Sequence, residues 1–205
     1  MAKYPKKIVD LANGGIFKRV VAKHFHFSKA TREAIDKAHR NADEAAARNP
    51  ITRRRNAYVG STPSKKSQVG QDVIRRMDGE TPPRIRGWDP DYPDDLTDVQ
   101  VKGSDGKWYE LEDCDMGHSP IDAVTYWNNV GRYHGPRSEQ VRDWMTDQDN
   151  YELQPGPINQ ADGRIMGNSG FTYQPPVTLP DGVDIAVIEP RVLEDLKNFK
   201  GDPVP

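Results

Sequence analysis

The sequence predicts an α+β fold in which helices surround a small antiparallel hairpin. Apolar residues follow a helical spacing in the part of the chain up to Met77 and again from Ile121 onward. Between Val99 and Leu111 the spacing changes to every second residue, which is typical of a strand with one buried face. Gly and Pro number 17 each, and the mean hydropathy is -0.86, so polar loops should connect these elements.

The N-terminal part of the chain, up to the Asn-Pro pair at residues 49–50, is expected to be helical. Helical spacing over residues 16–21 follows a break at the Asn-Gly-Gly of residues 13–15. Ser28, or alternatively Thr31, is expected to cap a second helix over residues 29–48, which the Asn-Pro pair ends. This second helix is rich in Ala and poor in large apolar residues, so we expect an arm or a connector rather than a core element.

A basic stretch over residues 53–67 is expected to be flexible and to lead into a short helix over residues 69–77. Val73, Ile74 and Met77 share one face of that helix and should point inward. A loop rich in Pro and Asp follows over residues 81–97.

The hairpin is expected around the turn sequence at residues 103–106, Gly-Ser-Asp-Gly. Its second strand should run on toward Asp115 and His118. The remaining elements are expected to be a helix over residues 121–133, a helix capped by Ser138 with Val141, Trp144 and Met145 on its inner side, a strand at 151–153, a short helix at 156–163, a strand at 183–188 and a helix at 190–199.

Charge is divided unevenly along the chain. The part up to Lys66 carries 16 Lys and Arg against 5 Asp and Glu, whereas the remainder carries 13 against 26. Such a split suggests a basic arm that binds a polyanion and an acidic site or partner surface.

Cysteine and hydropathy exclude several classes of protein. Cys114 is the single cysteine, so an intrachain disulfide and a Cys-rich zinc site are excluded, and we expect its thiol to point into the core. No apolar run approaches the roughly 20 residues needed to span a bilayer, and no apolar segment follows the basic start as in a signal peptide. We therefore expect a soluble protein that another system carries if it leaves the cell.

The sequence Asp115-Met116-Gly117-His118-Ser119-Pro120 is the strongest functional signal. Asn150 and Asn159 follow it in an order that suits metal-dependent phosphodiester hydrolysis. Such a site needs oxygen ligands for one divalent cation and a neutral His beside the cation that takes a proton from water. We expect Asp115 and Asn159 to hold the cation, His118 to be the general base, and Asn150 to hold the His loop through side-chain to backbone hydrogen bonds.

These residues resemble the HNH/endonuclease VII (ββα-metal) superfamily. Within it they are most similar to the GH-E-type nuclease toxin domains of bacterial polymorphic and type VI secretion effectors. The resemblance covers about residues 60–176. It rests on Asp115–His118, Trp127-Asn128-Asn129, Gly131-Arg132, Arg137-Ser138-Glu139, Val141-Arg142, Trp144-Met145, Asn150-Tyr151, Leu153, Asn159 and the segment from Thr62 to Met77.

The resemblance implies a ββα-metal core, wrapped by helices, that cuts DNA in a competing cell. One divalent cation, Mg²⁺ first and otherwise Zn²⁺, Mn²⁺ or Ni²⁺, would be the cofactor. A cognate immunity protein would neutralise the enzyme in the cytoplasm of the producing cell, and a dedicated secretion system would deliver it to the cytoplasm of the target cell. Residues 1–59 would then be a basic helical arm that joins the nuclease domain, residues 60–205, to a secretion adaptor or to the rest of an effector.

Two acidic residues fit this pattern in more than one way. Glu139 would match the Glu of the GH-E motif and take part in catalysis, although an acidic residue just after the Ser138 cap also suits a helix N-terminus. Many relatives follow the last Asn with Ser and His, whereas Asn159 is followed by Gln-Ala-Asp. Asp162, or water, would then complete the ligand set.

Basic residues are the candidates for contacting phosphate groups. Arg132 and Arg137 lie nearer the motif than the basic stretch does, and they are expected to contact the scissile strand. The basic stretch would add affinity that falls with salt and that selects no base sequence, through Arg53, Arg54, Arg55, Lys65 and Lys66.

Two other functions remain open. The same fold could serve as an inactive module that binds nucleic acid or a protein partner, although such a module has no need of Asp115 and His118 together. The substrate could also be RNA, which the sequence does not distinguish from DNA.

Overall fold

The computed structural model describes residues 3–48 and 54–199, and it has the mixed α+β composition that the sequence predicts. Its described residues form two compact units. Unit 1 contains the chain up to Ser61, residues Ala123–Asp143 and the chain from Ile165 onward. Unit 2 contains Thr62–Asp122 and Trp144–Arg164. The N-terminal helices thus share a unit with two later segments, a different division from the boundary at residue 60 that the sequence suggested.

Unit 1 is helical. Its elements are α1 (Lys6–Asp10), the π-helical turn η1 (Leu11–Gly15), α2 (Ile16–His24), α3 (Lys29–Arg48), α4 (Arg54–Tyr58), α6 (Ala123–Tyr126), the π-helical turn η3 (Trp127–Gly131), α7 (Arg132–His134) and α10 (Ile185–Lys197). Two helices begin in one unit and end in the other, namely α8 (Glu139–Thr146) and α9 (Gly156–Ser169).

The core of unit 1 forms around α2. Ile16, Phe17 and Val20 are fully buried, and α2 packs against α10 and η3. The break expected at residues 13–15 is a kink between α1 and α2, where Gly14 adopts a φ of 109° that favours glycine. These apolar residues make the N-terminal helices part of a core.

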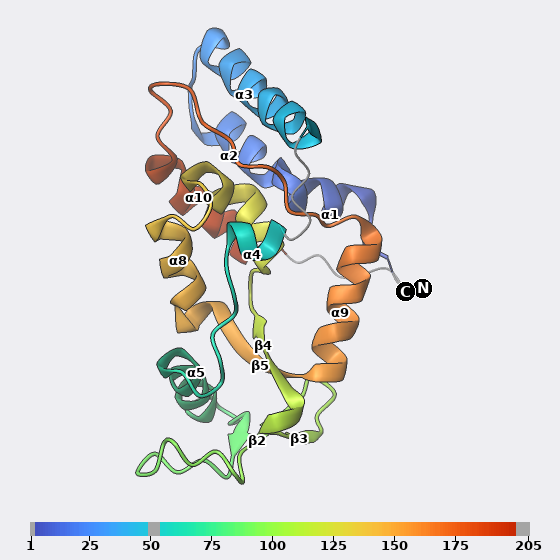
Figure 1. Cartoon of the computed structure of the whole chain (residues 1–205), viewed down its shortest axis with the longest axis vertical. Helices are drawn as coiled ribbons and strands as arrows, with labels where there is room; N and C mark the ends of the chain where they lie inside the picture. Colours follow the sequence, from blue (N-terminus) through green and yellow to red (C-terminus); the bar gives the residue numbers. More distant parts are fainter. Residues whose placement is uncertain (1–2, 49–53, 200–205) are drawn as a thin grey trace. The chain divides into compact units, whose positions relative to one another are not determined.

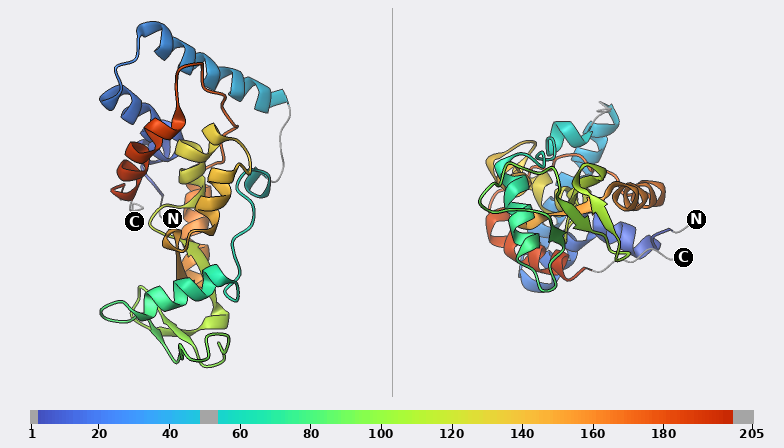
Figure 2. Two further views of the ribbon diagram at one scale, coloured as in Figure 1. Left: turned by 90° about the vertical axis from the view of Figure 1, so that its left-hand side faces the viewer. Right: turned by 90° about the horizontal axis from the view of Figure 1, so that it is seen from below.

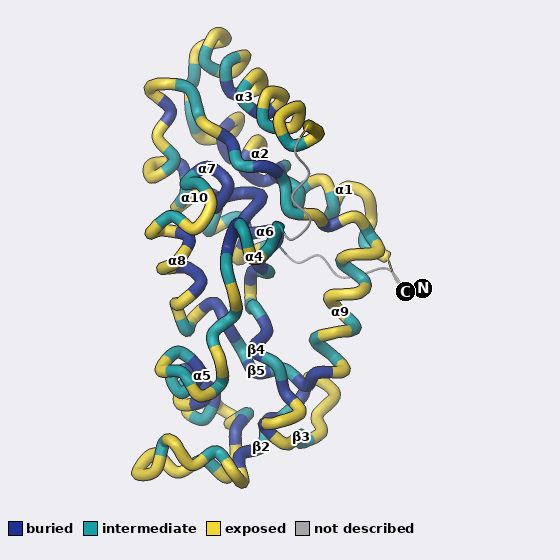
Figure 3. The backbone as a smooth tube through the Cα atoms, viewed as in Figure 1, coloured by how far each residue is buried: buried dark blue, intermediate teal, exposed yellow. Residues whose placement is uncertain are grey.

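Helix α3 spans the expected residues 29–48, and Ser28 caps it by accepting a hydrogen bond from the Thr31 amide at 3.1 Å. Only Ile35 and His39 are buried among its described side chains, and Figure 3 shows the rest of the helix largely exposed. This confirms that α3 contributes a thin apolar face.

The prediction of a strand at residues 183–188 is wrong. Helix α10 begins at Ile185, and Asp184 caps it by accepting a hydrogen bond from the Ala186 amide at 2.9 Å. Ile188, Val192 and Leu196 are buried at every fourth position, so the helical period of this face decides the conformation.

Unit 2 contains both β-sheets. In one sheet, β1 (Ile85–Arg86), β2 (Gln100–Lys102) and β3 (Trp108–Glu110) are antiparallel. In the other, β4 (Cys114–His118) pairs with β5 (Tyr151–Pro155). The expected hairpin is β2–β3, but its second strand does not run on to His118. The 3₁₀ turn η2 (Leu111–Asp113) ends it, and β4 joins the other sheet.

Helix α5 (Gln68–Asp78) lies against β5 and β1 (Figures 1 and 2). Its Val73, Ile74 and Met77 are fully buried, as predicted, and they pack in a cluster with Met116 of β4 and Leu153 of β5. Cys114 belongs to the same cluster, and burial raises the pKa of its thiol to about 11.

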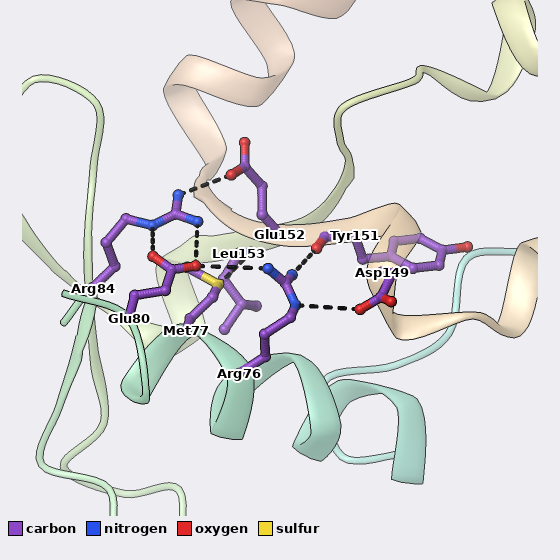
Figure 4. Close-up of polar contacts among 8 residues, drawn as sticks. All are labelled: Arg76, Met77, Glu80, Arg84, Asp149, Tyr151, Glu152 and Leu153. Carbon is purple, nitrogen blue, oxygen red and sulfur yellow. Dashed lines mark hydrogen bonds and ion pairs between the residues drawn. The ribbon is translucent and has the colours of Figure 1, made fainter. Parts of the chain in front are cut away.

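Two arginines connect α5 and the segment after it to β5 (Figure 4). Arg84 donates to Glu80 at 2.6 and 2.9 Å and to Glu152 at 2.8 Å. Arg76 donates to the carbonyl of Tyr151 and pairs with Glu80 at 3.6 Å. These contacts fix the strand that faces β4.

Within the described part of the chain, no helix combines the length and the apolar character needed to cross a membrane.

Candidate functional site

The register of β4 and β5 assigns the side chains of the motif to two faces. Asp115 pairs with Gln154, Met116 with Leu153, and His118 with Tyr151. Directly opposed residues share a face of an antiparallel pair, and successive residues alternate between faces. Met116 and Leu153 lie in the apolar cluster of unit 2, so Asp115 and Gln154 occupy the outer face.

Asp115 and Asn159, the two expected cation ligands, lie together on this outer face. The Asn159 amide Nδ2 donates to Asp115 Oδ2 at 3.1 Å. Asn159 is the fourth residue of α9, which begins directly after β5. The carboxylate of Asp115 therefore lies close to the N-terminal end of α9.

Gly117, beside these two residues, lets the side chains of Gln154 and Asn159 approach the backbone of β4 closely. A Cβ atom at Gly117 would collide with Gln154 Oε1 and would lie 3.2 Å from Asn159 Oδ1. Two amide oxygens thus converge over Gly117, close to the carboxylate of Asp115. A carboxylate and amide oxygens are donors that suit Mg²⁺ or Mn²⁺, which keep several water ligands.

Among the described residues, no group of three or more His, Cys, Asp and Glu side chains comes together as a set of cation ligands. A cation beside Gly117 would be held by Asp115, Asn159 and Gln154.

His118, the expected base, lies on the opposite face of β4 from Asp115. Its ring stacks on Trp144, with centroids 5.4 Å apart and an interplanar angle of 6°, and contacts Tyr151 at 4.4 Å. Because His118 is the last residue of β4, it ends the strand against these two aromatic rings. The structure therefore brings the two ligands together but does not place the imidazole on their face.

Asn150 acts at a different backbone group from the one expected. Its side chain donates to the carbonyl of Trp144 at 3.0 Å, whereas its own carbonyl accepts a hydrogen bond from the Ser119 amide at 3.1 Å. The backbone of Asn150 thus holds the residue after His118, and its side chain holds the residue whose ring stacks on His118.

Lys65 is a structural residue, contrary to the expected phosphate contact. Its ammonium group donates to the carbonyls of Leu111, Glu112 at 3.1 Å and Cys114 at 2.6 Å. These three bonds use all three of its donors and fix the turn that leads into β4. The neighbouring Lys66 is exposed and keeps its charge available at the surface of unit 2.

The described arginines that were expected to contact phosphate belong to unit 1, and two of them donate hydrogen bonds to backbone carbonyls of that unit. Arg137 donates to the carbonyl of Asn56 at 2.9 and 2.6 Å, and Arg54 donates to the carbonyl of Tyr173 at 3.2 Å. Arg132 is only 3% exposed, which excludes contact with the backbone of a nucleic acid at the surface in this conformation. Arg55 is half-buried, and Arg53 lies outside the described residues.

The two remaining acidic candidates lie on different helices. Glu139 is in the first turn of α8, in unit 1, where its charge suits the helix N-terminus. Asp162 lies one turn after Asn159 on α9 and lines a cavity of about 210 Å³ with Gln154 and Glu152. Partial burial raises the pKa of Asp162.

The roles of Gln154 and Gly117 beside Asp115, and of Trp144 and Tyr151 against His118, were not predicted from the sequence. The alternation of β5 was a usable signal for Gln154, because once Leu153 is assigned inward its neighbours must point outward. The contact of Trp144 with His118 had no sequence signal, because the two residues lie far apart in the chain.

Neither a protein-family model, nor a curated protein, nor a solved structure matches this chain. A functional assignment therefore depends on the geometry around Asp115.

Proposed function

We propose that the protein is a metal-dependent endonuclease that hydrolyses DNA phosphodiester bonds. The supporting observation is the contact of Asn159, at the start of α9, with Asp115 of β4 at 3.1 Å. Along the chain β4 is followed by β5 and then by α9, with helices α6, α7 and α8 between the two strands, and this order is compatible with a ββα-metal site. The oxygen donors around Gly117 fit one divalent cation, with Mg²⁺ first.

Each residue of the site has a proposed role. Asp115 and Asn159 hold the cation, and Gln154 is the nearest further donor. When bound, the cation stabilises the charge that develops on the phosphate and on the leaving oxygen. His118 is the proposed general base; to take a proton from the attacking water, its ring would have to turn away from Trp144 toward the face of Asp115, while Asn150 holds the backbone beside it.

The remaining parts of the proposal concern substrate and partners. Exposed Lys66 of unit 2 would contact a phosphate without selecting a base sequence. By its resemblance to the GH-E-type toxins, the enzyme would act in competing bacteria and would be neutralised by a cognate immunity protein. Such a protein could bind the acidic part of the chain.

The first test is a cleavage assay with purified full-length chain, free of any inhibitor. Plasmid DNA and a structured RNA would be incubated with Mg²⁺ or Mn²⁺, with and without EDTA. We expect cleavage of DNA that requires the cation. Because the ring of His118 and the carboxylate of Asp115 lie on opposite faces, their roles are tested separately with Asp115→Ala and His118→Ala. Each should lower the rate by about 100-fold or more, the usual size of a general-base contribution.

Gly117→Ala tests the proposed cation position. The added methyl group would occupy the space over Gly117 and displace Gln154, so we expect weaker Mn²⁺ binding, measured by calorimetry, together with lost cleavage. Gly163→Ala is the matched control, because a Cβ there meets nothing within 4 Å. It should keep full activity and gain slightly in helix stability.

Two results would contradict the proposal. Intact DNA under every cation would exclude the nuclease and favour a binding module. Cleavage that survives Asp115→Ala and Gly117→Ala would place the active centre elsewhere. If only His118→Ala stays active, the cation site stands and the base is another group. Cleavage of RNA in place of DNA would change the substrate but keep the site.

A further inference from the structure

The three-stranded sheet of unit 2 has one apolar face and one polar face. Ile85, Val101 and Tyr109 lie opposite one another on the face that packs in the apolar cluster of the unit. Side chains alternate along a strand, and opposed residues share a face. The other face, called the outer face, therefore carries Arg86 of β1, Gln100 and Lys102 of β2, and Trp108 and Glu110 of β3.

Arg86 is exposed, yet two contacts fix the position of its guanidinium group. Its Cζ lies 4.4 Å from the centroid of the Trp108 ring, and its Nε donates to Gln100 Oε1 at 2.6 Å. The Gln100 amide in turn donates to Glu110, which fixes the orientation of that amide. Among the described residues, Arg86 donates a hydrogen bond through Nε alone, so both amino groups of its guanidinium remain available to a ligand.

Lys102 brings a second positive charge to the same ring. Its Nζ lies 5.8 Å from the centroid of Trp108. Neither Lys102 nor Arg86 forms an ion pair with a described acidic side chain, whereas Arg84 and Lys107 of the same unit do. Acidic residues outnumber basic ones in this part of the sequence, so two unpaired cations beside one ring are unusual here. The outer face thus has a capacity to bind an anion that the described side chains do not use.

The outer face leads toward the candidate cation site. Gly103, directly after β2, lies so close to the end of β5 that a Cβ atom there would be 3.0 Å from Pro155 Cγ. Lys102 and Gln154, the proposed further donor to the cation, line the same cavity of about 210 Å³. A polyanion whose reacting phosphate lies at the cation would therefore continue past Lys102 toward Arg86.

Acidic side chains nearby limit the affinity for an anion. Glu110 lies on the outer face itself, where it accepts the hydrogen bond from Gln100. Glu152 and Asp162 line the cavity, although Glu152 is paired with Arg84 at 2.8 Å. We therefore expect binding that is weak and that falls steeply as salt is added.

We propose that the outer face binds the phosphodiester backbone of DNA through Arg86 and Lys102. DNA as the polyanion rests on the proposed nuclease function. The amino groups of Arg86 would donate two parallel hydrogen bonds to one phosphate, and Lys102 would bind a neighbouring phosphate as a point charge. Because Trp108 and Gln100 already hold the guanidinium group, little side-chain freedom is lost on binding. Contacts of this kind select no base sequence.

The test measures DNA binding by the full-length chain in the absence of cleavage. A short fluorescein-labelled duplex is titrated in EDTA, which removes the divalent cation, at NaCl concentrations from about 50 to 200 mM. Arg86→Gln and Lys102→Gln should each weaken binding by about 2- to 5-fold, the range of an exposed ion pair. Each should also reduce the slope of log K against log salt concentration by about 0.9, the value for one lost phosphate contact.

Lys107→Gln is the matched control, because Lys107 lies in the turn of the same hairpin but pairs with Asp105 at 3.4 Å. It removes the same charge and should leave both the affinity and the slope unchanged. Arg86→Lys keeps the charge and therefore the slope, but it lacks the planar group that stacks on Trp108, so it should bind more weakly than the parent. This variant also serves if Arg86→Gln does not fold.

The proposal is overturned if Arg86→Gln and Lys102→Gln bind DNA as the parent does, or if Lys107→Gln weakens binding equally. Competition by polyglutamate as strong as that by unlabelled DNA of equal charge would assign the face to an acidic protein segment, which also overturns it. Binding that depends on Arg86 in a chain that cuts no DNA would keep this inference and exclude the nuclease. Cleavage and binding that are both unchanged by the substitutions would keep the nuclease and exclude this face.

Discussion

The two units differ in how they compensate their most enclosed positive charges. In unit 2, Lys65 donates to three carbonyls and Arg84 donates to two carboxylates. Arg76 donates to one carbonyl and forms ion pairs with Glu80 at 3.6 Å and with Asp149 at 4.0 Å, although its Nε has no hydrogen-bond partner in the described structure. In unit 1, Arg132 is more deeply buried than any of these, yet its Nε and Nη2 have no hydrogen-bond partner in the described structure. Compensated cations stabilise a backbone geometry, whereas the guanidinium group of Arg132 is buried at a cost that the ring of Tyr133, with its centroid 5.8 Å from Cζ, offsets only in part.

The partners of the unit 2 cations all belong to the same region of the fold. Lys65 holds the turn before β4, and Arg76 and Arg84 hold β5. The contact of Asp115 with Asn159 lies between β4 and the start of α9. The basic residues of unit 2 thus fix the two strands next to the candidate site, and only Lys66 among those predicted to bind nucleic acid is exposed in the described part of this unit.

The largest expected stability effect is that of Lys65→Met. Three carbonyl groups would lose a charged donor, and hydrogen bonds to charged groups contribute about 1.5–3 kcal/mol each when they are buried. Because Lys65 is only half-buried, we expect a total loss of about 2–3 kcal/mol in the free energy of unfolding of unit 2. Hydrogen exchange of the β4 amides under native conditions would measure it.

Lys66→Met is the matched control for this change, because the neighbouring side chain is exposed. It should change the free energy of unfolding by less than about 0.5 kcal/mol. Equal effects of the two substitutions would mean that Lys65 is not the residue that fixes the turn. If the proposed nuclease activity is present, Lys65→Met should also reduce it by displacing Asp115.

Arg84→Met should cost less, about 1 kcal/mol, because its side chain is 34% exposed and solvent screens its ion pairs. The loss arises from Glu80 and Glu152, which would lose their shared partner. Denaturant unfolding would measure it, and the exposed Arg86→Met is the control. Since Arg132→Met should be neutral or stabilising, a destabilisation as large as that of Arg84→Met would remove the contrast between the units.

The sequence was sufficient for elements whose signal is local. Residues 29–48 contain their own cap and helix formers, residues 69–77 contain a clear apolar face, and Gly103–Gly106 forms the turn of β2–β3. The same local rule failed at residues 183–188. There, Val and Ile residues that favour a strand compete with two helix signals, a cap at Asp184 and a buried apolar residue at every fourth position. Packing of the apolar face favours the helix.

The candidate site could be predicted only in part, because its contacts are long-range. The order of Asp115, Asn150 and Asn159 suggested a shared site, and the structure does bring Asp115 to Asn159. The strand pleat, however, separates Asp115 from His118, because residues three positions apart in one strand point to opposite faces. The carbonyls that Lys65 contacts lie in a distant segment of the chain. The Nε and Nη2 atoms of Arg132 have no hydrogen-bond acceptor in the described structure. No local sequence pattern indicates either environment.

A pH titration compares the units through their titratable groups. In unit 1, His39 of α3 is buried, and desolvation lowers its pKa below the ordinary value of 6.5. In unit 2, the hydrogen bond from Arg84 lowers the pKa of Glu80 below its ordinary value of 4.5. Neutral His39 contributes fully to the free energy of unfolding above about pH 6.5, and this contribution is lost as the pH falls from there toward the pKa of His39 in the folded state. The contribution of charged Glu80 is lost only as the pH falls below 4.5.

The hydrogen bonds of His39 explain why protonation should release α3. Its Nδ1 lies 2.8 Å from the carbonyl of Ile35, an acceptor, so Nδ1 carries the proton. Its Nε2, 3.0 Å from the Tyr133 hydroxyl, then accepts a hydrogen bond. A proton on Nε2 would remove that acceptor, and nearby Arg132 and Lys18 would repel the new charge more than Asp43 attracts it.

Between pH 7 and pH 5.5 the amides of α3 should therefore lose protection from hydrogen exchange, after correction for intrinsic rates, while those of β4 and β5 keep theirs. His39→Gln cannot gain the charge, so its α3 protection should be lower at pH 7 but independent of pH in this window. Equal losses in both units, or a pH-dependent loss that persists in His39→Gln, would assign the effect to another group. Unchanged protection of the α3 amides across this pH window would mean that the hydrogen bonds of His39 do not hold α3. The helix would then depend on the packing of Ile35, and the buried polar groups of unit 1 would contribute little to the stability of that unit.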